Sequence, residues 1–198
     1  LMLVLWNTYN FFITYAQVDD YSPNSKSVND SKNVLDKWII SLLNKLILNV
    51  TESLDKYDAV LAIERIQDFV NDFSTWYIRR SRDRVGPSAE NIQDKHDFYN
   101  TSYNVLTALT KLLAPIAPFI SEEIYMNLTK EESVHLADWP KSNKKLINKE
   151  LEEEMVNARK IVEASHALRK QAEIKVRIPI RSMTYNGPFE ISDEVLSV

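Results

Sequence analysis

Apolar residues recur every three or four positions along most of this 198-residue sequence, and this period constrains the fold more than any other feature. Between about 32 and 55, for example, Leu35, Trp38 and Leu42 share one broad apolar stripe. A helix with such a stripe must bury it against other helices. Because the period continues to about residue 173, we predict an all-α fold, an antiparallel helical bundle.

Breaks in the period predict where the helices begin and end. We expect six helices, at about 1–17, 32–55, 59–84, 94–114, 118–128 and 148–173. Ser31 and Asp58 are placed to cap the second and third helices. The run Gly86-Pro87-Ser88 ends the third. Pro115 and Pro118 separate the fourth from the fifth, since proline lacks an N–H group.

After residue 173 the period changes from that of a helix to that of a strand. Residues 175–180 have apolar side chains at every second position, Val176, Ile178 and Ile180, and Asn186-Gly187 marks a turn before a further helix capped by Ser192. We therefore predict two parts. Residues 1–173 form a helical domain whose first helix is truncated at its N-terminus, and residues 174–198 begin a small C-terminal α/β junction subdomain with a short β segment.

Composition excludes several classes of active site. With only two glycines, the chain cannot build the glycine-rich loops that hold ATP or NAD phosphates. With no cysteine it has no disulfide, no thiol nucleophile and no cysteine-bound zinc. The three histidines lie far apart and at no metal-binding spacing. We expect no catalytic residue, metal or cofactor in this chain.

Charge and hydropathy limit the partners. The net charge is −4, so any contact with nucleic acid must come from a local basic patch. No apolar run approaches the roughly 20 residues of a membrane-spanning helix. The absence of cysteine fits a reducing compartment, and we expect a cytoplasmic protein.

Three stretches resemble one family. LDKWIIS at 35–41 within residues 33–57, LAPIAPFISEEIY at 113–125 and SVHLADWP at 133–140 resemble, in order and spacing, the anticodon-binding domain of class I aminoacyl-tRNA synthetases for valine, leucine and isoleucine. FVNDFSTWYIRRSRDR at 69–84, and LRK at 168–170 followed by IKVRIPI, are similar to the isoleucine enzymes, in particular their eukaryote-like form. Val85-Gly86 and Glu173 depart from the family's pattern, which has an aromatic pair and a small residue there.

The resemblance implies a function and partners. It implies a module that binds the tRNA(Ile) anticodon stem-loop beside the catalytic and editing domains of the same, longer chain. ATP and Mg²⁺ would then belong to the parent isoleucine–tRNA ligase, and this fragment would be inactive alone. Two alternatives remain open: the same domain of a valine enzyme, and a helical scaffold that binds proteins.

Two basic segments supply the candidate RNA-binding residues, which need cations for phosphates and flat groups for unstacked bases. The arginine segment, residues 79–84, has net charge +3, and the basic stretch, residues 159–181, has net charge +5. The candidates are Arg79, Arg82, Arg84, Arg169, Lys170, Lys175 and Arg177.

Helical geometry divides the arginine segment. With Phe73 facing the core, Arg79 and Arg82 point away, whereas Arg80 and Arg84 return to the core side. The competing interpretation is therefore that Arg80 and Arg84 form structural ion pairs, with Asp83 an alternative partner for Arg79. Trp76 and Trp139 are possible base platforms, although a core position is favoured for Trp76.

Overall fold

The computed structural model describes residues 1–23, 31–86, 89–187 and 190–196. Its contacts divide the chain into two units, Leu1–Ile147 and Asn148–Val198. The first contains α1 (Met2–Val18), α2 (Val34–Asp55), α3 (Ala59–Asp72), η1 (Phe73–Ile78), η2 (Arg82–Arg84), α4 (Ile92–Leu113), α5 (Pro118–Thr129), η3 (Val134–Leu136) and η4 (Lys144–Leu146). The second contains α6 (Lys149–Gln171) and α7 (Asp193–Leu196). The predicted all-α class is confirmed.

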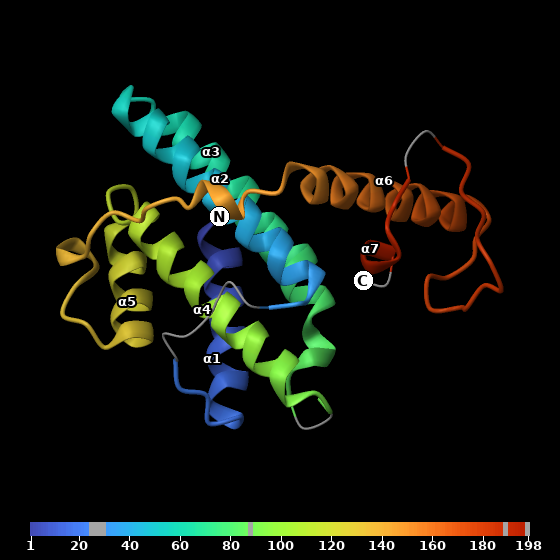
Figure 1. The fold of residues 1–198 in the computed structure, drawn as a ribbon, viewed down its shortest axis with the longest axis horizontal. Helices are drawn as coiled ribbons and strands as arrows, with labels where there is room; N and C mark the ends of the chain where they lie inside the picture. Colours follow the sequence, from blue (N-terminus) through green and yellow to red (C-terminus); the bar gives the residue numbers. More distant parts are fainter. Residues whose placement is uncertain (24–30, 87–88, 188–189, 197–198) are drawn as a thin grey trace. The chain divides into compact units, whose positions relative to one another are not determined.

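Helices α2 and α3 form an antiparallel hairpin, α4 packs against α2 and α1 packs against α3 and α4, while α5 packs against α4 (Figure 1). Short polar side chains fix where the two hairpin helices begin. Asn33 caps α2 by accepting from the Leu35 N–H at 2.9 Å, and Asp58 caps α3 by accepting from the Leu61 N–H at 2.9 Å. The cap predicted at Asp58 is confirmed. The one predicted at Ser31 is wrong, because its hydroxyl donates instead to the Asp36 carboxylate.

A column of aromatic rings forms the centre of the bundle. Phe69, Phe73 and Tyr77 follow one another along α3 and η1, and Phe98 of α4 continues the column. The successive ring centroids are 6.3, 5.5 and 5.8 Å apart, and the rings are nearly parallel. Phe73, Tyr77 and Phe98 are fully buried. This column fixes which face of the third helix points inward, and therefore where the arginines that follow it lie.

The segment after η3 is fastened along α2. Trp139 donates its indole N–H to the Thr51 hydroxyl at 2.8 Å, and the Asn143 N–H donates to the Asn44 side-chain oxygen at 2.7 Å. Trp139 is still 36% exposed. Its indole nitrogen thus holds the segment to the hairpin.

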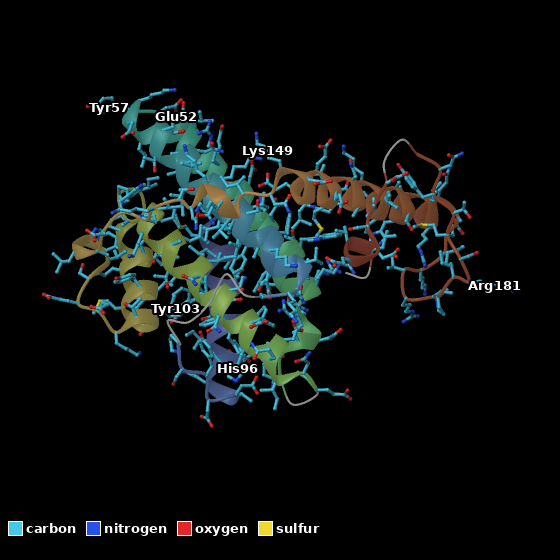
Figure 2. All side chains as sticks on the ribbon, in the orientation of Figure 1. Glu52, Tyr57, His96, Tyr103, Lys149 and Arg181 are labelled. Atoms are coloured by element: carbon cyan, nitrogen blue, oxygen red, sulfur yellow. The ribbon has the colours of Figure 1, made fainter. Side chains whose placement is uncertain are left out.

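The tip of the hairpin is exposed, including all of residues 55–60. Figure 2 shows Glu52 and Tyr57 there. Tyr57 is 97% exposed and has a φ of 59°, the left-handed turn that reverses the chain between α2 and α3. The arginine segment follows the other end of α3, roughly 30 Å away along the helix at 1.5 Å per residue.

The second unit differs from the prediction in two ways. Its boundary lies between Ile147 and Asn148, so α6 groups with the residues after it, not with the bundle. Residues 175–180, predicted as a β segment, contain no strand, and none occurs elsewhere in the described residues. Alternation alone is insufficient, because a strand needs a neighbour to pair with. Here Arg169 donates to the carbonyl oxygens of Val176 at 3.4 Å and Ile178 at 2.8 Å instead.

Glu173, where the family pattern has a small residue, ends α6 with a φ of 55°. This left-handed conformation favours glycine, which explains the small residue in the pattern. Over the residues that the structure describes, no helix is long and apolar enough to cross a membrane.

Candidate nucleic-acid interface

The arginine segment begins after a π-helical turn. Residues 73–78 are wound as a π-helix (η1), in which hydrogen bonds span one more residue than in an α-helix. The π-helical turn therefore holds about one residue more than an α-helical turn. The side chains that follow it point roughly 100° away from the direction that a continuous α-helix would give them. Such turns are frequent at functional sites.

The π-helical turn changes which arginines face outward. In a continuous α-helix Arg80 would lie only about 20° from Phe73, and hence toward the core. In the structure it is exposed, as are Arg79 and Arg82. The prediction that Arg80 forms a structural ion pair is therefore wrong, and the prediction that Arg79 and Arg82 point away from the core is confirmed. The alternative pairing of Arg79 with Asp83 is not seen in the described residues.

Three of the segment's four arginines each lie over an aromatic ring. The guanidinium carbon of Arg80 is 4.8 Å from the centroid of the Trp76 ring, and that of Arg82 is 5.9 Å from the centroid of Phe11 on α1. Arg84 lies 5.6 Å from Phe98 in the same way. These cation–π contacts restrict the long side chains before any ligand arrives. Arg80 was not among the predicted binding residues, although its spacing of four from Trp76 was a readable signal.

Arg84 is part of a buried ion-pair network, which we call the Asp36 network. Its two terminal nitrogens donate to the two oxygens of Asp36, both at 2.7 Å, and its Nε donates to Asp94 at 2.9 Å. The Tyr77 hydroxyl and the Ser31 hydroxyl also donate to Asp36, at 2.7 and 2.6 Å. The side chains of Arg84 and Asp36 are 9% and 1% exposed. Arg84 thus joins η2, α2 and α4, so the structural ion pair expected for it is confirmed and its guanidinium is not available to RNA.

Electrostatics keep this network charged. Burial lowers the pKa of Arg84, but the hydrogen bonds to Asp36 and the electrostatic interactions with Tyr77, Asp36 and Asp94 outweigh it and raise the pKa above its ordinary value. Burial, reinforced by the negative charge of Asp36, raises the pKa of Tyr77 well above its ordinary value. The guanidinium therefore stays protonated and the phenol stays a donor.

A second network, around Asp19 at the end of α1, fastens the far end of the arginine segment. Asp19 accepts from Lys95 at 3.0 Å, from the Tyr99 hydroxyl and from the Gly86 N–H, and Lys95 also donates to the Gly86 carbonyl at 3.0 Å. Gly86 has a φ of 85°, and a Cβ there would lie 3.2 Å from the Tyr15 ring. With Arg84 and Gly86 both tied down, Arg79, Arg80 and Arg82 project from a rigid base. The Pro87 and Ser88 of the predicted helix end lie outside the described residues.

The remaining candidates belong to the second unit. Lys170, Lys175 and Arg177 are exposed on and after α6, and Figure 2 shows Arg181 on the loop that follows them. Arg169 is half-buried and donates to the loop's carbonyl oxygens. Arg169 therefore shapes the loop that displays the other cations.

Trp76 is only partly buried, whereas Trp38 is 1% exposed and belongs to the core. The core position favoured for Trp76 is thus only partly realised, and Arg80 covers part of the ring. Within the described parts of the chain, no group of three or more His, Cys, Asp or Glu is arranged to hold a metal ion.

Known proteins are similar to this chain over most of its length. The family model described as the anticodon-binding domain of tRNA ligase matches residues 36–184. Isoleucine–tRNA ligases of Dehalococcoides mccartyi (strain CBDB1) and Clostridium tetani (strain Massachusetts / E88) are 44% and 45% identical over 185 residues, which is 90% of this chain. The chain spans 18% of the length of each.

A solved structure shows the same fold. It is the Agrobacterium radiobacter K84 agnB2 LeuRS in a ternary complex with tRNA and LeuAMS, with a TM-score of 0.54 and 21% identity over 74% of this chain and 16% of that one. At this identity the likeness concerns the fold alone. The family model covers well over half of the sequence. The chain therefore belongs to the family of anticodon-binding domains of tRNA ligases.

Proposed function

We propose that this chain binds the anticodon stem-loop of tRNA(Ile) as part of an isoleucine–tRNA ligase. The observation that carries the proposal is the set of three exposed arginines, Arg79, Arg80 and Arg82, on a segment that the Asp36 and Asp19 networks fasten to the bundle. The similarity to isoleucine–tRNA ligases supports the choice of tRNA over that of a valine enzyme.

The arrangement suits a folded RNA hairpin. An RNA stem offers closely spaced phosphates, and its loop offers bases that can be unstacked and read. Cations that contact phosphates displace bound counterions, so binding by such a surface weakens as salt rises. With a net charge of −4 the chain repels nucleic acid in general, and the local cluster must determine where the RNA docks.

The proposal extends to the parent enzyme. The parent attaches isoleucine to its tRNA, and its catalytic domain uses ATP and Mg²⁺ for that reaction. Within the same chain, the catalytic domain and the editing domain are the partners of this module. The absence of cysteine is compatible with a cytoplasmic setting, where we place the enzyme.

Binding of a labelled anticodon stem-loop across a salt series tests the proposal. We expect the tRNA(Ile) stem-loop to bind more tightly than one with a valine anticodon. Arg82→Ala weakens binding and lowers the log–log salt slope by about one, the effect of losing one phosphate contact. Lys56→Ala removes the same charge at the exposed hairpin tip and serves as the matched control.

Thermal unfolding of both variants shows whether the fold is intact. If Arg82→Ala retains the wild-type affinity and slope, the arginine segment does not contact the RNA, and the proposal loses the observation that carries it. If no stem-loop binds above background, the proposed function itself is wrong for this chain.

A further inference from the structure

The π-helical turn places Trp76 and Arg80 on the outer surface as a pair. They are four residues apart, and the guanidinium carbon of Arg80 lies over the Trp76 ring at 4.8 Å. Arg80 is exposed, so solvent and ligands can reach its side chain even with the ring beside it. The pair is flanked by the exposed cations Arg79 and Arg82.

We propose that Trp76 and Arg80 form a stacking platform for one unpaired base of the bound RNA loop, an inference that rests on the proposed function. The base lies flat on the open face of the Arg80 guanidinium, which the indole supports from behind. Arg79 and Arg82 then contact the phosphates on either side. Unstacked bases are commonly received by aromatic rings and by arginine planes, and here the two are combined.

Two physical arguments favour stacking over a simple phosphate contact for Arg80. A guanidinium group is planar and weakly hydrated, so a base can cover it at little desolvation cost, which is not true of a lysine ammonium group. The contact with Trp76 also restricts Arg80 in advance, so less rotamer entropy is lost on binding. A phosphate contact alone needs charge but no ring beneath it.

The critical variant is Arg80→Lys, which keeps the charge and removes the plane. We expect Arg80→Lys to bind the tRNA(Ile) anticodon stem-loop about tenfold more weakly than wild type, with an unchanged salt slope. Arg82→Lys is the comparison variant, and we expect it to lose less affinity than Arg80→Lys, because a lysine still pairs with a phosphate. Trp76→Leu weakens binding, whereas Trp76→Phe, which keeps a ring, restores most of it.

A set of stem-loops with one abasic site at each loop position identifies the base. For wild type, the affinity falls about tenfold when the abasic site is at one particular loop position. For Arg80→Lys, the abasic site at that position causes no further loss of affinity, because the variant no longer stacks on that base. Thermal melts of the Trp76 variants show whether weaker binding comes from a loss of folding. The Arg80→Lys variant tests stacking without altering a partly buried residue, because Arg80 is exposed.

Each outcome decides between explanations. If Arg80→Lys binds like wild type, Arg80 contacts a phosphate or nothing, and the platform is ruled out. If Arg80→Lys binds weakly but no abasic position is coupled to it, the base is not the partner and the proposal is likewise wrong. If wild type itself binds no stem-loop, the proposed function fails first, which is a distinct result.

Discussion

Arg79 and Arg84 lie five residues apart in one arginine-rich segment, yet their environments are opposite. Arg79 is exposed, whereas Arg84 is buried between Asp36 and Asp94. Sequence alone supplies the same residue type at both positions. What separates them is the rotation of the helix and the presence of acids on α2 and α4.

This contrast predicts a difference in stability. Arg84→Ala leaves Asp36 buried without its cation, and we expect the free energy of unfolding to fall by about 3–5 kcal/mol. Arg79→Ala changes it by less than about 0.5 kcal/mol, as is usual for a surface position. Urea denaturation of both variants measures the difference. Equal, small effects would mean that the Asp36 network does not hold η2 to the bundle.

Asp19 gives a pH-dependent prediction. Burial raises its pKa, but hydrogen bonds from Tyr99, Lys95 and Gly86 and the charge of Lys95 outweigh burial, so the pKa in the folded state is lowered. A carboxylate with a lowered folded pKa stabilises the fold above its unfolded pKa of about 3.9. This contribution to stability is lost as the pH falls from the unfolded-state pKa through the lower folded-state pKa.

Asp19→Asn should therefore be less stable than wild type at neutral pH, and the gap should narrow below about pH 4. Tyr99→Phe removes one of the hydrogen bonds that lower the pKa, so it should reduce the acid dependence without abolishing it. Chemical denaturation at a series of pH values checks both variants. A gap for Asp19→Asn that stays constant down to pH 2 would contradict the role given to this carboxylate.

At the scale of elements, the π-helical turn explains how one extra residue is accommodated in the third helix. Phe69, before the turn, and Ser81, after it, are both buried in the core. Because they are twelve residues apart, a continuous α-helix would point them about 120° away from each other. One residue between them is surplus to an α-helical pattern, and the wider turn absorbs it.

We therefore expect deletion of Thr75, an exposed residue within η1, to be tolerated. The deletion removes the surplus residue, η1 becomes α-helical, and the core positions keep their register. Deletion of the exposed Gln67 in α3 instead rotates every later residue by about 100° and turns the aromatic column out of the core. Thermal melts should show cooperative unfolding for the first variant and not for the second. Similar losses in both would place the surplus residue elsewhere.

Most elements could be predicted from the sequence, because their ends carry local signals. The apolar period gave the helices of the first unit to within a few residues, and the cap at Asp58 and the break at Pro118 are as predicted. The π-helical turn could not be predicted, because nothing in FSTWYI forbids a regular helix, and its rotation reversed the environment of Arg80. The prediction of a strand at 175–180 is wrong, because alternating side chains do not show whether a neighbouring strand is present to pair with.

At the scale of the whole molecule, the two basic segments belong to different units. The arginine segment lies in Leu1–Ile147, and the basic stretch lies in Asn148–Val198. The first unit contains the complete aromatic column and both buried networks. Its length is within the range of independently folding domains. The two candidate surfaces can therefore be separated by shortening the chain.

A chain ending at Ile147 should unfold cooperatively, because the described contacts of its aromatic column and of both networks lie within it. If the arginine segment is the RNA-binding surface, this shorter chain still binds the tRNA(Ile) stem-loop, and Arg82→Ala still lowers its salt slope by about one. Loss of the cations of the second unit lowers the slope further but leaves the effect of Arg82 intact. Circular dichroism melts and salt-series binding measure the two properties separately. A shorter chain that folds but no longer binds would instead assign the interface to Lys170, Lys175 and Arg177, and one that no longer unfolds cooperatively would show that the first unit depends on the second.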